Sequence, residues 1–290
     1  MRVSGFTFIR NAIHYDYPIV EAIQSILPLC DEVVVAVGHS NDDTLALIQN
    51  MGDPKIKIIE TTWDDSLREG GKVLAVETDK ALAAVDPKSD WCIYIQGDEV
   101  LHEAGYAAIR ASMIAHQNDE KIDGLLLKYR HFYGSYDYIG TSAKWYKNEI
   151  RIVKNRKDIF SFGDAQGFRK LPDQKLHVKP VDAFMHHYGW VKDPRAMQLK
   201  QEDFNKLWHD DEWVRQHVVP AEKFDYGREL SELNIFQGTH PQVMESRIAR
   251  TNWKFETDIS MSRSSFKDKV KNFFYYRLGI ELGYKNYILK

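Results

Sequence analysis

The stretch WCIYIQGDE, residues 91–99, decides the fold of this chain. Its first five residues form an apolar run that is short enough for a strand buried on both faces. The run leads directly into Asp98 and Glu99, which have no basic neighbour in the sequence. Adjacent carboxylates repel each other, and such a pair normally holds a cation. Two interpretations stay open at this point, a cation site and a solvated acidic turn.

Short apolar runs of the same kind precede this stretch and alternate with helical patterns. Strands are predicted at residues 3–9, 33–37, 56–59 and 91–95, with helices at residues 44–51 and 73–85 and a further helix that begins after Asp16. Strands that alternate with helices at this spacing favour a parallel sheet with helices on both faces. We therefore predict an α/β fold.

The pattern changes after residue 103. Helices are predicted at residues 104–116 and 194–208, short strands at 124–129, 149–154 and 184–187, and an irregular loop or hairpin at 130–147. Neither an internal repeat nor a low-complexity linker interrupts the chain. A single α/β core over residues 1–205, followed by a mostly helical extension over residues 206–290, fits this pattern better than two independent domains.

The composition excludes several classes of protein. The chain carries 39 basic and 42 acidic residues, a net charge of −3, so no overall positive field marks a nucleic-acid-binding protein. Its two cysteines, Cys30 and Cys92, are too few for a disulfide scaffold and are typical of a reducing compartment. No apolar run approaches the roughly 18 residues that cross a bilayer, and no signal-peptide core opens the sequence. We expect a cytoplasmic protein.

Polar side chains follow four of the predicted strands. In open α/β sheets, ligands bind outside the carboxyl ends of the strands. The segments that fall there are Arg10 with Asn11 and residues 38–44, 63–65 and 96–99. We expect these four segments to border one binding site.

Four segments carry a further signal, namely DWCIYIQGDEVLHE (90–103), GHSNDDT (38–44), FSFGDAQGFRK (160–170) and HHYGWVKDPRAMQLK (186–200). Together they resemble family 2 glycosyltransferases with the GT-A fold. DWCIYIQGDEVLHE, residues 90–103, resembles the metal-binding strand of the subgroup that reads Gln-Ala-Asp-Glu in place of Asp-x-Asp. GHSNDDT, residues 38–44, keeps the Ser-x-Asp-x-Thr of the second nucleotide-binding loop. FSFGDAQGFRK, residues 160–170, is similar to the acceptor-side segment that presents a carboxylate base, and HHYGWVKDPRAMQLK, residues 186–200, to the block that supplies a histidine to the metal. The match covers about residues 4–200.

The resemblance implies a GT-A fold, with a single Rossmann-like mixed sheet flanked by helices and a C-terminal helical extension. It assigns residues 1–103 to the nucleotide-sugar-binding half and residues 104–205 to the acceptor-binding half. It also implies that Asp98 and His187, with His186 as the alternative, hold Mn²⁺ or Mg²⁺. Such a cation stabilises, as a Lewis acid, the negative charge that develops on the leaving nucleotide, and Mn²⁺ tolerates an imidazole more readily. The residues alone leave the histidine pair open between ligands and structural side chains.

The donor side combines this resemblance with the residues at the strand ends. The aspartate that the family has at the end of its second strand is replaced near Val37 and Gly38, so Asp64 or Asp65 is predicted to contact the base instead. Lys72 follows two glycines that let backbone N–H groups approach a phosphate, but a solvated lysine at a helix start fits equally. The residues predicted to bind the donor are Arg10, Asn11, Ser40, Asp42, Asp64, Asp65, Lys72, Gln96 and Asp98.

The acceptor side depends on Asp164. A single carboxylate within hydrogen-bond reach of the acceptor hydroxyl suffices as general base. Asp164 lies among Gly163, Ala165 and Gly167, and its alternative role is an aspartate that caps a turn. The residues predicted to line the acceptor pocket are Gln166, Phe168, Arg169 and Trp190.

The last stretch, residues 262–290, differs in composition from the rest. It holds seven basic and two acidic residues together with seven aromatic ones. Basic and aromatic residues mixed in this way suit a helix that lies on anionic lipid, at the inner face of the membrane. The alternative is a helix that docks on the core and has a solvated basic face.

These observations predict a metal-dependent, inverting glycosyltransferase that moves a sugar from a nucleotide-sugar donor to a carbohydrate or lipid-linked glycan acceptor, in surface glycan or polysaccharide assembly. One alternative is a nucleotidyltransferase on a related sheet, although such an enzyme usually has a glycine-rich basic loop after the first strand. The chain reads FIRNAIHYD there, without glycine. A catalytically inert carbohydrate-binding protein is the other alternative.

Overall fold

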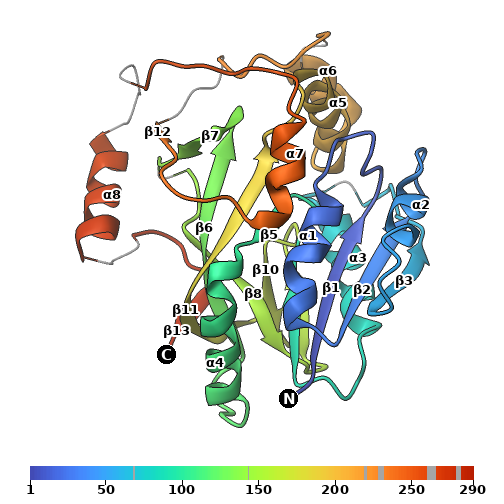
Figure 1. Ribbon diagram of the computed structural model, residues 1–290, viewed down its shortest axis with the longest axis vertical. Helices are drawn as coiled ribbons and strands as arrows, with labels where there is room; N and C mark the ends of the chain where they lie inside the picture. The colour runs from blue at the N-terminus through green and yellow to red at the C-terminus, as the bar shows by residue number, and fades with distance from the viewer. Residues whose placement is uncertain (68, 143, 219–220, 228–231, 260–265, 279–281) are drawn as a thin grey trace.

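The computed structural model describes residues 1–290 apart from residues 68, 143, 219–220, 228–231, 260–265 and 279–281 (Figure 1). Its strands are β1 (Val3–Ile9), β2 (Glu32–Gly38), β3 (Ile56–Thr61), β4 (Trp91–Tyr94), β5 (Glu99–Leu101), β6 (Gly124–Tyr133), β7 (Ser135–Gly140), β8 (Asn148–Lys154), β9 (Ile159–Phe162), β10 (Gly167–Lys170), β11 (Gln174–Trp190), β12 (Leu233–Ile235) and β13 (Tyr287–Leu289). Its α-helices are α1 (Ile19–Ile26), α2 (Thr44–Gln49), α3 (Lys72–Ala83), α4 (Tyr106–His116), α5 (Pro194–Phe204), α6 (Asp211–His217), α7 (Glu245–Ala249) and α8 (Phe266–Leu278).

The described strands form one mixed sheet, whose main path runs β3-β2-β1-β4-β8-β6-β11-β10-β9. β3, β2, β1 and β4 are parallel, as predicted from the alternating pattern of the first hundred residues. β8 runs antiparallel to both β4 and β6, which makes the sheet mixed. The predicted α/β fold, a single mixed sheet flanked by helices, is confirmed.

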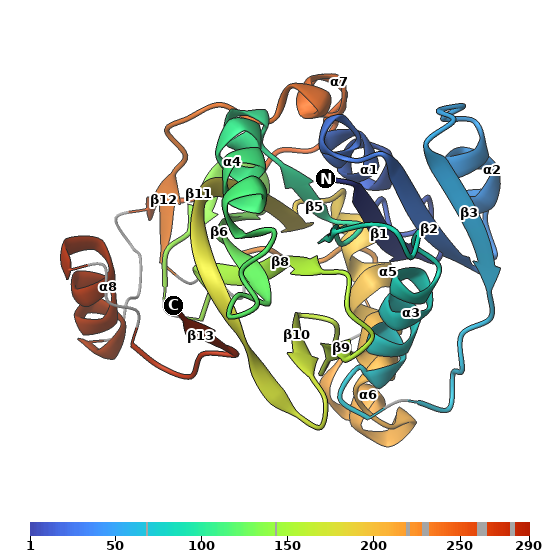
Figure 2. The ribbon, with the colours of Figure 1, turned by 90° about the horizontal axis from the view of Figure 1, so that it is seen from below.

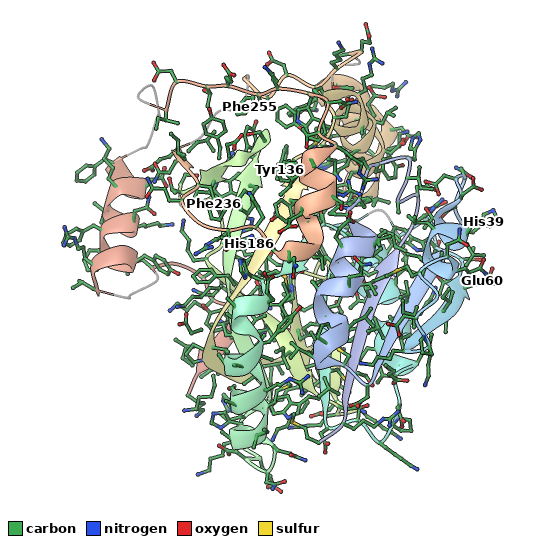
Figure 3. All side chains as sticks on the ribbon, in the orientation of Figure 1. His39, Glu60, Tyr136, His186, Phe236 and Phe255 are labelled. Atoms are coloured by element: carbon green, nitrogen blue, oxygen red, sulfur yellow. The ribbon has the colours of Figure 1, made fainter. Side chains whose placement is uncertain are left out.

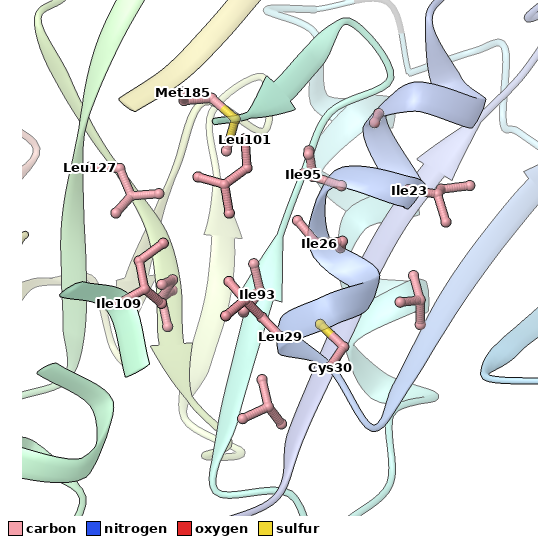
Figure 4. Close-up of a cluster of buried hydrophobic side chains, with 14 of the residues drawn as sticks. Ile23, Ile26, Leu29, Cys30, Ile93, Ile95, Leu101, Ile109, Leu127 and Met185 are labelled. Carbon is pink, nitrogen blue, oxygen red and sulfur yellow. The ribbon is translucent and has the colours of Figure 1, made fainter. Parts of the chain in front are cut away.

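The first half of the sheet has a hydrophobic core on each face. Figure 2 shows α1 and α4 on one side of this sheet and α3 on the other. Strand residues alternate between the faces. Val33 and Val35 of β2 pack on the side of α1 and α4, whereas Val34 packs on the side of α3. Figure 4 shows the first of these cores, in which Ile23 and Ile26 of α1 lie near residues of β4. Burial on both faces explains why the sequence of β2 is nearly continuously apolar.

The second half of the sheet is built from longer and more irregular strands than the sequence predicted. Of residues 130–147, for which an irregular loop or a hairpin is predicted, residues 130–140 belong to the β6–β7 hairpin. The described residues of 141–147 lie in neither a helix nor a strand. The short strand predicted at residues 184–187 is the end of the 17-residue β11, which runs parallel to β6. Residues 160–170 form most of the β9–β10 hairpin, which has left-handed backbone at Gly163 and Ala165 in its turn.

The chain after residue 205 contributes to the sheet as well as to the helices. β12 pairs with β7, and β13 runs parallel to β11. α8 stands at one edge of the molecule (Figures 1 and 2). Residues 262–265 and 279–281 of the predicted basic and aromatic tail lie outside the described residues. Within the described residues, none of the helices has the length and apolar character needed to cross a membrane.

One stability prediction arises from Asp79 on α3. Burial raises the pKa of its carboxyl group to about 6, although the backbone N–H of Ser161 donates to it. When the pKa of a carboxyl is higher in the folded state than in the unfolded state, the protein loses stability as the pH rises between the two. The loss begins near the unfolded-state pKa, about 4, and continues through the folded-state pKa. Asp79→Asn is therefore expected to unfold at a higher temperature than the parent protein at pH 7.5, and at nearly the same temperature below pH 4. Thermal unfolding followed by circular dichroism against pH checks this, and a pH-independent difference would contradict it.

Candidate active site

The carboxyl ends of β1 and β4 open onto a cleft of about 700 Å³. Segments that are far apart in the sequence line it: the residues after β1 and β4, the turn of the β9–β10 hairpin, the end of β11, and α5. Nine of the predicted site residues line this cleft, namely Arg10, Asn11, Asp65, Gln96, Asp98, Asp164, Gln166, His187 and Trp190. The structure therefore brings most of the predicted site together.

Asp98 and His187 lie side by side in the cleft. β5 follows Asp98 directly and pairs antiparallel with β11, so that Glu99 lies opposite His187. This register brings Nε2 of His187 to 3.8 Å from Oδ1 of Asp98, with both side chains 13% exposed. Gly189 makes the approach possible, because a Cβ there would lie 2.7 Å from Oδ2 of Asp98 and from Nε2 of His187.

Lys200 of α5 adds a positive charge to this pair. Its Nζ lies 3.3 Å from Oδ2 of Asp98 and donates to the carbonyl of Gly189. Burial alone raises the pKa of Asp98, but the positive charges around it, that of Lys200 foremost, outweigh the effect of burial and hold that pKa well below its usual range. Burial lowers the pKa of His187, against the opposing effect of Asp98. The site thus presents a carboxylate and a neutral imidazole to the cleft.

The structure places His186 on the other side of β11. Its ring is fully buried, Nδ1 lies 3.2 Å from Oη of Tyr188, and the ring packs against Phe236 (Figure 3). Successive strand residues point to opposite faces of a sheet, so only one histidine of the pair can face Asp98. The structure therefore brings His187, and not His186, to the cleft.

Glu99 does not face the cleft as a second free carboxylate. It is fully buried and forms a bidentate pair with Arg151 of β8, with N···O distances of 2.7 and 2.9 Å. Oη of Tyr129 donates to the same carboxylate at 2.6 Å. Glu99 has no basic neighbour in the sequence, and its partner comes from a strand 52 residues further along the chain.

A second stability prediction follows from this pair. Glu99→Gln leaves the Arg151 guanidinium buried without its counter-charge, and breaking a buried pair in this way costs about 3–5 kcal/mol of unfolding free energy. Urea denaturation measures this. Glu69→Gln is the matched control, since Glu69 and Lys72 form an exposed pair for which a loss of at most about 1 kcal/mol is expected. Equal losses in the two variants would contradict the prediction.

Asp164 lies in the turn of the β9–β10 hairpin. Burial raises the pKa of its carboxyl group. Two hydrogen bonds tie this turn to the sheet: Nε2 of Gln96 donates to the carbonyl of Ala165 at 3.2 Å, and Nη1 of Arg151 donates to that of Gln166 at 2.6 Å. Gln96 therefore positions the hairpin in addition to lining the cleft.

The donor-side residues divide into two groups. Arg10 and Asp65 line the cleft and pair at 2.7 Å, with the Arg10 guanidinium over the ring of Trp63. Trp63 also explains the glycine at the end of β2, because a Cβ on Gly38 would clash with Nε1 of this tryptophan. Asn11 lines the cleft as well, and its Oδ1 accepts a hydrogen bond from the backbone N–H of Asn41.

The other donor-side residues do not line the cleft. Oγ of Ser40 accepts from the backbone N–H of Asn11, and Asp42 accepts from that of His14, so both side chains hold the loops after β1 and β2 together. Asp64 is exposed and accepts from Ser66. Lys72 is exposed and pairs with Glu69, which agrees with the alternative of a solvated lysine at a helix start.

The acceptor-side predictions divide in the same way. Gln166 and Trp190 line the cleft. Phe168 is fully buried against Tyr94, with ring centroids 5.4 Å apart. Arg169 is buried and donates to Asn286 and to Oη of Tyr284, away from the cleft. The structure therefore does not bring Phe168 and Arg169 to the pocket for which they were predicted.

The sequence analysis missed Lys200 and His131, which both line the cleft. Lys200 was detectable in principle, since it follows Met197 by one helical turn and so lies on the apolar face of α5. A lysine on a buried helix face needs a partner, which is a functional signal. His131 carries no comparable signal within its own strand.

Comparisons with known proteins give distant structural likenesses. S. aureus TarS matches at 14% identity and a TM-score of 0.42, over 70% of this chain and 38% of that one. A TarS fragment, 1–349, in complex with UDP matches at 13% identity and a TM-score of 0.42, over 77% and 68%. Glucosyl-3-phosphoglycerate synthase from Mycobacterium tuberculosis, in complex with Mn²⁺, UDP and phosphoglyceric acid, matches at 20% identity and a TM-score of 0.30, over 45% and 43%. No protein-family model and no curated protein sequence matches the chain. This chain thus spans less than half the length of TarS and of the synthase.

Proposed function

We propose that this protein is a metal-dependent, inverting glycosyltransferase that moves a sugar from a nucleotide-sugar donor to a hydroxyl acceptor. One observation carries the proposal: Asp98, His187 and Asp164, from three separate parts of the chain, line a single cleft at the carboxyl ends of the strands. This is where open α/β sheets bind ligands. The four-segment resemblance to family 2 glycosyltransferases supports the same assignment.

Asp98 and His187 would hold the divalent cation. The carboxylate oxygen and the imidazole suit Mn²⁺ or Mg²⁺, and Gly189 leaves open the space that a Cβ would fill between them. The cation, when bound, stabilises the negative charge on the leaving nucleotide diphosphate as a Lewis acid. Within the described residues, no cluster of three His, Cys, Asp or Glu side chains forms a complete site, so phosphate oxygens of the donor are expected to complete the coordination.

The positive side chains of the cleft bind the diphosphate. Arg10, which follows β1, and Lys200, which lies on α5, both line the cleft. A buried or half-buried cation beside a phosphate is worth more than one in water, because the local dielectric is low. Trp63, next to Arg10, offers an aromatic face for the base of the donor.

Asp164 acts as the general base. It accepts the proton of the acceptor hydroxyl as that oxygen attacks the anomeric carbon, from the face opposite the nucleotide. A raised pKa suits this role, since a stronger base takes the proton more readily. A single displacement with one base inverts the anomeric configuration. Trp190 and Gln166, which line the same cleft, are proposed to contact a carbohydrate or lipid-linked glycan acceptor.

A donor screen tests the function directly. Incubation of the protein with UDP-, GDP- and dTDP-sugars and Mn²⁺ is expected to release a nucleoside diphosphate, and NMR of the sugar product reports its anomeric configuration. Release of pyrophosphate would instead favour the nucleotidyltransferase. An inert carbohydrate-binding protein would show neither release nor a joint thermal shift with Mn²⁺ and UDP.

We also propose that α8 contacts an anionic membrane surface, as expected for assembly of a surface glycan. Phe266, Lys269, Phe273 and Arg277 recur at helical spacing along one exposed stripe of this helix. Phe266 is 83% exposed and Phe273 is 57% exposed. Aromatic and basic side chains on one face are typical of helices that lie on lipid headgroups.

Charge reversal tests this contact. The double variant Lys269→Glu and Arg277→Glu is expected to bind phosphatidylserine vesicles at least about tenfold more weakly in co-sedimentation, since each basic residue near the surface contributes about 1 kcal/mol. Lys88→Glu with Lys157→Glu changes the net charge equally at exposed positions elsewhere and is expected to bind as the parent protein does. Equal loss in both double variants would contradict a specific contact.

A further inference from the structure

The histidine next to the proposed metal ligand lies on a neighbouring strand. β6 and β11 run parallel with His131 directly opposite His187. Nδ1 of His131 lies 3.1 Å from Nδ1 of His187, and Nε2 of His131 lies 2.8 Å from the backbone carbonyl of Tyr146. These two contacts form a series of hydrogen bonds from the Tyr146 carbonyl oxygen, through His131, to the proposed metal ligand His187.

The donors and acceptors in this series fix which ring nitrogens of the two histidines carry hydrogen. A carbonyl oxygen only accepts, so Nε2 of His131 carries a hydrogen. His131 is 2% exposed among the rings of Tyr129, Trp145 and Tyr146, and a charged imidazole is costly in such surroundings. The neutral ring leaves Nδ1 without a hydrogen. That atom must then accept from Nδ1 of His187.

We propose that His131 is a positioning residue that holds His187 in the tautomer whose Nε2 lone pair faces Asp98. In that tautomer two acceptors, Nε2 of His187 and Oδ1 of Asp98, face each other across 3.8 Å. Two acceptors with no hydrogen between them repel, and a cation between them removes the repulsion. The arrangement is therefore prepared for a metal ion before the ion arrives, and a partner that orients a histidine ligand typically strengthens metal binding.

The inference deepens the proposed function and rests on it for the presence of a cation at Asp98 and His187. It adds that affinity for the cation depends on a side chain that does not touch it. His131→Asn keeps an acceptor near the position of Nδ1, whereas His131→Phe keeps an aromatic ring between Tyr129 and Trp145 and offers no acceptor.

The first test reads the tautomer in the metal-free protein. Protein labelled with ¹⁵N-histidine is studied by two-bond ¹⁵N–¹H correlation NMR, with His187→Gln and His131→Asn used for assignment. We expect His187 to be protonated at Nδ1 and unprotonated at Nε2, and His131 to be protonated at Nε2. A hydrogen on Nε2 of His187, in either a neutral or a charged ring, would overturn the inference.

The second test measures Mn²⁺ binding without nucleotide, by water-proton relaxation. His131→Phe is expected to bind Mn²⁺ about 10–100-fold more weakly than the parent protein, the usual effect of losing a partner that orients a histidine ligand, and His131→Asn to bind nearly as well as the parent. Unchanged affinity in His131→Phe, or equal loss in both variants, would overturn the inference. Neither readout requires turnover, so a protein that transfers no sugar would refute the proposed function while these results still decide the role of His131.

Discussion

Asp98→Asn is expected to abolish Mn²⁺-dependent binding of nucleotide. The substitution keeps the shape of the side chain but removes the negative charge that Lys200 and His187 face. A neutral amide is a poor ligand for a hard divalent cation, and the positive Lys200 then repels the cation without compensation. Calorimetric titration of UDP, with Mn²⁺ and with EDTA, measures the effect. We expect heat of binding in the parent protein with Mn²⁺ and none in the variant.

The control for this variant is Asp64→Asn. Asp64 was a predicted donor contact, yet the structure places it in an exposed turn outside the cleft, where it accepts from Ser66. We expect this variant to bind UDP with Mn²⁺ as the parent protein does. Undiminished Mn²⁺-dependent binding in Asp98→Asn would refute the assignment of the cation site.

Asp164→Asn is expected to remove transfer while leaving donor binding intact. The amide cannot accept the proton of the acceptor hydroxyl, and a positioned general base contributes about 10²–10⁴-fold to a rate. The hydrogen bonds that tie this turn to the sheet run from the side chains of Gln96 and Arg151 to the carbonyls of residues 165 and 166, so the substitution leaves them in place. Steady-state kinetics with the donor identified by the screen, together with UDP titration, separate the rate from the affinity.

A matched control lies in the same hairpin region. Asp158 precedes β9 and pairs with Arg156 on the surface, so Asp158→Asn is expected to change neither transfer nor binding. Normal turnover in Asp164→Asn would refute its role as base. A joint loss of transfer and UDP binding would show that Asp164 supports the donor site instead.

Much of the candidate site could be predicted because its residues follow strands that the apolar pattern reveals. Asp98 is one example, since the end of β4 is visible in the sequence and parallel strands end at one edge of the sheet. The pairing of His187 with Asp98 was inferred only through resemblance. The choice between His186 and His187 needed the face on which each side chain lies, which depends on the register of β11 against β5.

Other parts of the site had no local signal. Phe168 and Arg169 follow Asp164 closely, yet the β9–β10 hairpin directs Phe168 into the core and Arg169 towards Asn286. The alternation of side chains in a strand separates residues that the sequence places together. His131 was missed for the opposite reason, since strand pairing joins it to a residue 56 positions away.

The sequence by itself determined the order of strands and helices in the first hundred residues and the position of a carboxylate at the end of β4. Local apolar periodicity records which residues are buried, and it does so without reference to distant parts of the chain. Only the tertiary structure decided that Arg151 neutralises Glu99, that Lys200 accompanies Asp98, and that His131 meets His187. Periodicity specifies burial but not partners, because a partner is selected by the register and packing of segments that are distant in the chain.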